Sequence, residues 1–124
     1  MRRDEGSAVV DFALVGALLV LVLLSVLQLA VALHVRATLV ASAAEGAREA
    51  AASGRGLADG VRRTRELVRA SLPASYAGEV TAWYEDDAGL RTVAVEVRAP
   101  LPVVGLVGPS ADLVVVGHAV VEPP

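Results

Sequence analysis

The two histidines and the one pair of adjacent aspartates are the first candidates in this chain for acid–base or metal chemistry. Asp86 and Asp87 stand side by side in the segment DDAG, whereas His34 and His118 lie far from them in the sequence. Adjacent carboxylates can hold a metal ion or transfer protons. DDAG, however, separates two segments of alternating hydrophobicity and has the composition of a hairpin turn, in which Gly89 is expected to supply the left-handed position of a hairpin with a bulge. We therefore expect both carboxylates at a hairpin tip, not in a catalytic or metal site.

The histidines and the serines lack the neighbours that catalysis needs. His34 abuts a long apolar run and is expected at a membrane interface, and His118 stands among valines in a predicted strand, its ring satisfied locally. No recognisable motif places a base beside a serine, and the sequence has no phosphate-binding glycine loop. The sequence therefore predicts a protein that is not an enzyme, with no cofactor and no metal site.

Charge and composition exclude further classes of function. The net charge is -3, the sequence pI is about 5.3, and every basic residue is an arginine, which gives no overall basic surface for nucleic acid. The chain has no cysteine, so it has no disulfide and no thiolate ligand or nucleophile. Its 124 residues are 55% hydrophobic but only 3% aromatic. A single small domain with a membrane anchor fits this length and composition.

Another acid, Asp11, lies directly before the N-terminal end of the long apolar run. From Phe12 to Leu33 the apolar residues are interrupted only by one serine, one glutamine and small residues. About 22 residues at 1.5 Å each span about 33 Å, which matches a hydrocarbon core of about 30 Å. Insertion of the Leu, Val and Phe side chains contributes about 4 to 9 kcal/mol, which outweighs one carboxylate at the edge. The run therefore predicts a transmembrane helix that contains residues 12–33.

Two other interpretations of the apolar run fit it less well. A cleaved secretory signal has a shorter apolar core of about 7 to 15 residues, and the small-residue segment ASAAEGA lies too far beyond this run for a cleavage site. A wholly buried helix would need a larger domain around it than a chain of this length supplies. The arginines on the two sides of the run nearly balance, so the positive-inside rule gives almost no orientation.

The helical period continues beyond the apolar run and then restarts once. Small and apolar residues recur near one face at Val35, Leu39, Ala43, Gly46, Ala47 and Ala50. This pattern predicts that the first helix runs to about Ser53 and stops at Gly54. A second helix is predicted in RGLADGVRRTRELVRASLP, before Pro73. Its apolar stripe comprises Leu57, Val61, Thr64, Val68 and Leu72.

Each helix also carries a surface with two possible roles. The small-residue face of the first helix could admit another helix at close range, or its alanines could simply favour helix formation. The arginine stripe of the second helix could contact acidic lipid headgroups or a partner. It could equally be a solvated face that contains an Arg62–Glu66 pair.

After Ser75 the hydrophobic period becomes two, which is typical of strands. Three strands are predicted, over residues 79–85, 90–99 and 112–122. The third is apolar on both faces and is expected to be central or well covered. The apolar Pro/Gly segment PLPVVGLVGPSA before it is expected to be a loop. The fold class is therefore α+β: a long N-terminal transmembrane helix that continues into a packed helix, a second short helix, and a three-stranded antiparallel sheet.

The segment GSAVVDFALVGALLVLVLLSVLQLAVAL, followed by the Ala-rich helix ATLVASAAEGAREAAASG and a short β-rich end, resembles the TadE-like family. These proteins are the pseudopilins of the tight-adherence (Tad, or Flp) pilus system. The resemblance covers nearly the whole chain in layout, and its specific motifs lie in about the first 50 residues. It implies a pilin-like domain behind a single membrane anchor.

The resemblance also implies a processing and assembly device at the N-terminus. In type IV pilins a membrane prepilin peptidase cuts after a glycine at the cytoplasmic face, and an acid, usually Glu, stands five residues beyond that glycine. The matching positions here are Gly6, Ser7 as the new N-terminus, and Asp11, which departs from the usual Glu. Asp11 lies one helical turn beyond Ser7, so it could pair with the new amine of its own chain, pair with that of a neighbour, or cap the first turn.

This device favours an N-terminus in the cytoplasm. The expected layout is a cytoplasmic leader at 1–6, a transmembrane helix at 7–34, and an extracytoplasmic pilin-like domain at 35–124. The expected function is that of a minor pilin or pseudopilin in the inner membrane, acting in assembly of a Tad pilus for adhesion or transport. Its expected partners are other pilins, the inner-membrane assembly platform, the prepilin peptidase and membrane lipid. The alternative is a signal-anchored envelope protein that binds partners without entering a filament.

Overall fold

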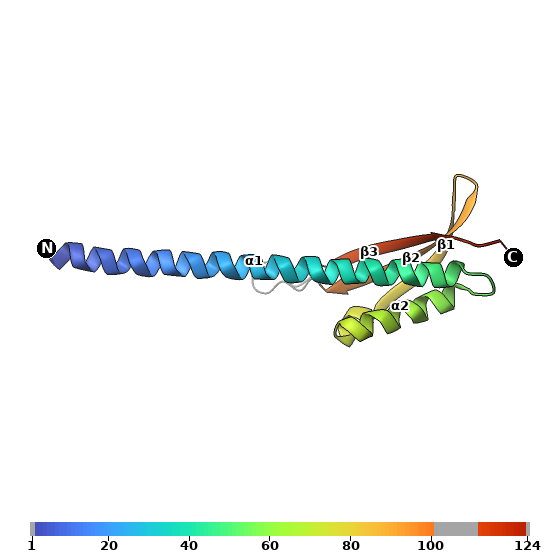
Figure 1. Cartoon of the computed structure of the whole chain (residues 1–124), viewed down its shortest axis with the longest axis horizontal. Coiled ribbons are helices and arrows are strands. Elements are labelled where there is room, and N and C mark those ends of the chain that lie inside the picture. The colour runs from blue at the N-terminus through green and yellow to red at the C-terminus, as the bar shows by residue number, and fades with distance from the viewer. Residues whose placement is uncertain (1, 101–111, 124) are drawn as a thin grey trace.

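A computed structural model describes residues 2–100 and 112–123 of the chain; most of the segment predicted as a Pro/Gly loop, residues 101–111, lies outside this range. The elements are the helices α1 (Arg2–Ala51) and α2 (Leu57–Ser71), the 3-10 helix η1 (Ala74–Ala77), and the strands β1 (Glu79–Asp87), β2 (Leu90–Pro100) and β3 (Asp112–Val120). Helix α1 is a rod whose C-terminal part packs with α2 and the sheet, while its N-terminal part projects alone (Figure 1). The predicted α+β fold is confirmed.

Helix α1 runs without a break from the projecting segment into the domain. At 1.5 Å per residue its 50 residues extend about 75 Å. The helix ends at Ala51, two residues before the predicted end at Ser53. Gly54 then adopts a φ of +79°, a left-handed conformation that glycine enters without steric cost. The chain thereby reverses direction, so that α2 returns antiparallel along α1.

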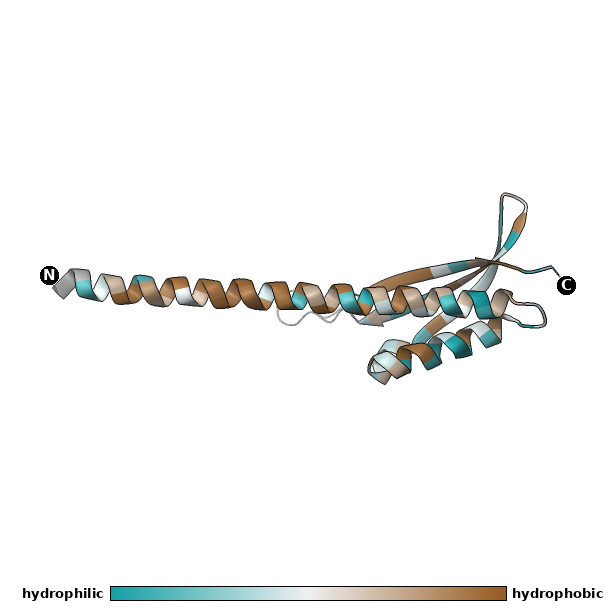
Figure 2. Cartoon of the chain, in the orientation of Figure 1, coloured by the Kyte–Doolittle hydropathy of each residue, from teal (hydrophilic) through white to brown (hydrophobic). Residues whose placement is uncertain are grey.

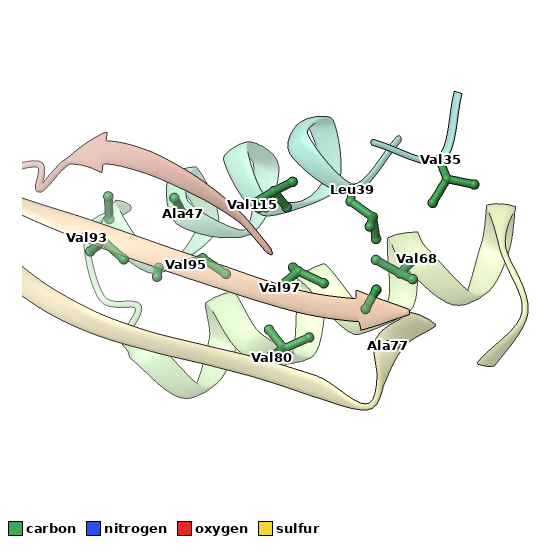
Figure 3. Close-up of a cluster of buried hydrophobic side chains, with 14 residues drawn as sticks. Val35, Leu39, Ala47, Val68, Ala77, Val80, Val93, Val95, Val97 and Val115 are labelled. Atoms are coloured by element: carbon green, nitrogen blue, oxygen red, sulfur yellow. The ribbon is translucent and has the colours of Figure 1, made fainter. Parts of the chain in front are cut away.

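The core lies between α1, α2 and one face of the sheet (Figure 3). All six residues predicted on the inner face of α1 are buried, as are Val68 from α2 and Val93, Val95 and Val97 from β2. Val61, Leu57 and Leu72 of the predicted α2 stripe are only half-buried and lie at the edge of the core. Valine and alanine dominate this core, so its stability depends on close approach of backbones more than on large side chains.

Helices α1 and α2 approach closely because small residues face each other. A Cβ added at Gly60 would lie 2.6 Å from the Ala50 Cβ, and one added at Gly46 would lie 2.7 Å from the Gly60 carbonyl oxygen and overlap the Thr64 hydroxyl. That hydroxyl donates a hydrogen bond of 2.8 Å to the Gly60 carbonyl, so it is satisfied although buried. The small-residue face of α1 does admit another helix, and that helix is α2 of the same chain.

The sheet has the order β1-β2-β3 with both pairs antiparallel. The prediction that the third strand is central or well covered is wrong, because β2 is the central strand and β3 is an edge. One face of β3 packs on α1, where a Cβ at Gly117 would clash with the backbone of Ala43 and Ala44. On the other face, Val114 and Val116 are exposed. The valines of β3 therefore cover the core from one side only.

The C-terminal residues fasten the end of β3 to the end of α1. The Glu122 backbone N–H donates to the carbonyl oxygen of Ala51 at 2.9 Å. The Glu122 carboxylate accepts a hydrogen bond of 3.3 Å from the Ser53 N–H. The last carbonyl of α1 is thus satisfied by a residue that follows the last strand of the fold.

The hairpin between β1 and β2 is tighter than predicted. Asp87 pairs directly with Leu90, so the loop contains two residues, Ala88 and Gly89, with φ values of +50° and +84°. The predicted loop with a bulge at Gly89 is therefore wrong. Two positive φ values are what a type I′ turn requires, and such turns follow the right-handed twist of the strands. Ala88 carries the steric cost of a left-handed conformation at an exposed position.

We expect Ala88→Asn to stabilise the domain by about 1 kcal/mol, because asparagine tolerates the left-handed conformation of this turn better than alanine does. For a domain of this size, that corresponds to a rise of about 4 to 8 °C in the melting temperature, measured by circular dichroism. Ala58→Asn, at an exposed position of α2, is the matched control and is expected to lower stability by a few tenths of a kcal/mol. A rise in both variants would contradict the turn argument.

Candidate membrane anchor and assembly site

The N-terminal part of α1 is apolar on all sides and uncovered. Its most apolar 18-residue window has a mean hydropathy of 2.8 and no residue buried inside the structure. The large hydrophobic residues from Val9 to Leu33 are all exposed, and most of the ribbon over this part of α1 is coloured as hydrophobic in Figure 2. The alternative of a helix buried in a soluble domain is therefore wrong. This segment is a candidate membrane anchor.

Hydroxyl groups along α1 are satisfied within the helix itself. The Ser25 hydroxyl donates to the Leu21 carbonyl oxygen at 2.8 Å, and the Thr38 hydroxyl donates to the His34 carbonyl at 2.9 Å. In hydrocarbon an unsatisfied polar group costs several kcal/mol, so Ser25 needs no partner from another chain to be tolerated there. His34 is exposed, just beyond the apolar run.

The three residues of the predicted processing site lie in the first turns of α1. Gly6, Ser7 and Asp11 are all exposed, and α1 is continuous across the predicted leader and the start of the span. A Cβ at Gly6 would meet nothing within 4 Å. Ser7 and Asp11 are four residues apart, so the helix places them on the same face, one turn from each other. Among the described residues, no element of the domain covers the Gly6–Ser7 bond.

The solvent face of α2 is an ion-pair network. The Arg62 guanidinium lies 3.1 Å from Asp59 and 3.8 Å from Glu66, so the predicted Arg62–Glu66 pair is present. A hydrogen bond from the Gly56 backbone N–H to the Asp59 carboxylate, together with Arg62 and Arg55, lowers the pKa of Asp59. A lowered pKa favours the folded state above the normal range of Asp titration, and this contribution is lost as the pH falls through the folded pKa. The start of α2 is therefore weakened in acid.

The open face of the sheet carries a polar bridge over the central strand. The Trp83 indole N–H donates to the Glu85 carboxylate at 2.6 Å, and His118 Nε2 lies 3.5 Å from the other Glu85 oxygen. Glu85 belongs to β1 and His118 to β3, so their contact crosses β2 above Thr92 and Ala94, which are buried. The sequence predicted only that the His118 ring would be satisfied locally, and the structure places beside it a carboxylate from β1, two strands away. Strand order was needed to find it.

Asp86 and Asp87 lie at the end of β1, beside the hairpin turn, as predicted. Both are exposed, and the hairpin projects from the distal end of the domain (Figure 1). The arginine opposite Asp86 is Arg91, whose guanidinium carbon lies 4.1 Å from the centre of the Tyr84 ring. Within residues 5–100 and 112–123, no three His, Asp or Glu side chains gather as metal ligands would.

The comparison with known proteins agrees with this description of α1. A family model described as TadE-like protein matches residues 6–48. The match begins at Gly6, covers the apolar segment and ends within the part of α1 that packs on the sheet. No curated protein and no solved structure gives a match. The long helix of this chain, from Gly6 to Arg48, is therefore similar to TadE-like proteins, which is the resemblance that its sequence predicted.

Proposed function

We propose that this chain is a membrane-anchored minor pilin or pseudopilin that acts in assembly of a Tad pilus. One observation carries the proposal: the TadE-like helix presents an uncovered apolar surface along the whole segment from Val9 to Leu33, and then enters the core of a folded domain without a break. A surface apolar on every side requires lipid or neighbouring helices around it. A pilin needs both environments in turn.

The proposed orientation places the N-terminus in the cytoplasm and residues 35–124 outside the inner membrane. The proposed partners are other pilins, the assembly platform of the inner membrane, a prepilin peptidase and the lipid around the span. The role is structural and not catalytic, and involves no nucleic acid. The exposed Gly6–Ser7 bond and the same-face placement of Asp11 support processing followed by docking.

The test is Asp11→Ala in cells that make the pilus. The variant should still resist carbonate extraction, and its domain should stay open to external protease in spheroplasts, because removing a charge favours insertion. Pilus-incorporated copies should fall by at least about tenfold, since the ion pair that favours docking in hydrocarbon is lost. Asp11→Glu restores the usual acid of pilins and should assemble, and Glu5→Ala, which removes an acid outside the predicted mature chain, should behave like the parent chain.

Two results would contradict the proposal. A domain protected from external protease would exclude the orientation. Unchanged pili in a strain that lacks this chain altogether would favour the accessory envelope protein, which binds partners without taking part in a filament.

A further inference from the structure

Most charged side chains of the domain are paired within it. Arg48, Arg55, Arg62, Arg63 and Arg98 each lie within 4 Å of a carboxylate, and Arg91 lies over a tyrosine ring. Two pairs of neighbouring side chains with like charge have no such partner among the described residues. One is Arg65 and Arg69 on α2, and the other is Asp86 and Asp87 beside the hairpin turn.

The two arginines border a groove on the outer face of α2. The groove has a volume of ≈530 Å³ and is lined by Ala58, Val61, Arg62, Arg65, Glu66 and Arg69. Ala58 and Val61 give the groove an apolar part, and Arg65 and Arg69 stand one helical turn apart along it. Like charges at this spacing repel each other, so the pair gains from any anion that enters. Arginine forks are well suited to carboxylates. We name these six lining residues the arginine groove.

The hairpin tip of the same chain has the complementary chemistry. It consists of Asp86, Asp87, Ala88 and Gly89, all exposed. Two carboxylates flank two small residues that could rest on an apolar floor. The tip is narrow, because its loop has only two residues. We propose that the arginine groove of one copy receives the hairpin tip, residues 86–89, of a second copy, with the carboxylates beside Arg65 and Arg69.

The fold determines how two such copies would be arranged. Close contacts of Gly60 with Ala50, and of Thr64 with Gly46, place Arg65–Arg69 beside residues 41–45 of α1. Hydrogen bonds of Val121 with Arg91, and of Glu122 with Ala51, place the base of the hairpin level with the end of α1. Six to ten residues of α1 separate the two levels, or about 9 to 15 Å. In two copies with parallel α1 helices, the groove of one and the tip of the other reach the same level only under one condition. The copy that supplies the groove must be shifted outward along the helix axis by about that distance.

This contact joins two different surfaces, a groove and a tip. Every pair of copies therefore still has one free groove and one free tip. Such a head-to-tail interface repeats without closing unless the rotation between copies happens to complete a ring. Copies anchored at the same depth in one membrane do not bring the two surfaces to the same level, whereas copies staggered along a filament do. The inference rests on the proposed function and adds to it a specific contact between neighbouring domains.

The test is disulfide cross-linking of the full chain, which has no native cysteine. Cells of the pilus-forming strain would co-express two differently tagged copies, one with Glu66→Cys, an exposed lining position between Arg65 and Arg69, and one with Ala88→Cys at the tip. Mild oxidation should join the two tags. Pairing Ala88→Cys with Ala74→Cys, an exposed site on η1 and outside the groove, should give at least about tenfold less product, as expected for random collision.

Charge reversal decides whether the ion pairs cause the contact. Arg65→Glu with Arg69→Glu in the groove copy should lower the cross-linked yield by about tenfold, because two attractions become repulsions. Asp86→Arg with Asp87→Arg in the tip copy should do the same, and combining the two reversals should restore the yield. All four positions are at the surface, and circular dichroism of each variant would verify folding. Arg65→Gln with Arg69→Gln provides a milder variant if a reversal unfolds the domain.

A yield that does not change with either reversal, or that combined reversal fails to restore, would overturn the inference. Absence of the cross-link in piliated cells would do so as well. These outcomes differ from failure of the proposed function, which would appear as unchanged pili in the strain lacking the chain. If deletion removes the pili and no cross-link forms, only the contact between groove and tip is wrong.

Discussion

Val95→Asp is expected to abolish folding of the domain formed by residues 35–124. Val95 is fully buried at the middle of the central strand, opposite Ala82 on β1 and Gly117 on β3. None of its neighbours there offers a positive charge. A carboxylate buried without a partner costs several kcal/mol, which approaches the whole stability expected for a small domain, about 5 kcal/mol or slightly more.

The measurement is thermal and urea unfolding of the purified 35–124 fragment, followed by circular dichroism. The parent fragment should unfold cooperatively, and Val95→Asp should show no cooperative transition. Val114→Asp is the matched control, because it introduces the same change on the open face of β3, opposite Arg98. It should remain within about 1 kcal/mol of the parent. A normal transition in Val95→Asp would show that the core is assigned to the wrong face of the sheet.

Periodicity predicted the elements of this fold well, since each element buries one face. In α1 the spacing of Val35, Leu39 and Ala43 already identified the inner face, and all three are buried. In β2 the alternation of Val93, Val95 and Val97 identified the core face of the sheet. These residues obey the simplest rule of amphipathic structure, in which the period of the apolar residues gives both the element and its orientation.

Strand order was not predictable from the same pattern. A strand apolar on both faces is usually central, and β3 has that composition, yet β3 lies at the edge. The structure shows what covers its inner face, the α1 backbone at Gly117, but gives no reason for the exposed Val114 and Val116. Hydrophobicity along a strand indicates how much of the strand is buried, not where it lies in the sheet. An edge strand can also be largely apolar when a helix packs directly on it.

Contacts between distant residues were also beyond the reach of the sequence. The Glu85–His118 contact depends on both the strand order and the register of two antiparallel strand pairings. The arginine groove required knowing which arginines of α2 already have partners, and only side-chain positions supply that. By contrast, the proposed processing site at Gly6, Ser7 and Asp11 was predicted from spacing and family resemblance alone, because such a site on an uncovered helix needs no tertiary structure to assemble it.

The other large effect is expected at Gly6, where we predict that Gly6→Leu blocks processing completely. Glycine leaves the backbone open to close approach by a peptidase, whereas leucine places a branched side chain beside the bond to be cut. Intact-mass measurement of the membrane-extracted protein should find the parent chain beginning at Ser7 and the variant retaining residues 1–6. Gly16→Leu is the matched control, because Gly16 also has open space around it in α1 but lies inside the span. It should be processed like the parent.

In the proposed function, cleavage after Gly6 comes before docking through Asp11. This order predicts how the two variants should compare. The amine that Asp11 is proposed to pair with does not exist until the bond after Gly6 is cut, and a free α-amine is largely charged near neutral pH. Gly6→Leu should therefore reduce assembly as much as Asp11→Ala does, and combining the two changes should cause no further loss, because both remove the same ion pair. A parent chain that stays uncut in cells with an active peptidase, yet assembles normally, would mean that Asp11 acts without the new amine. It would not act as an N-cap in that chain, because α1 runs without a break from Arg2 through Asp11.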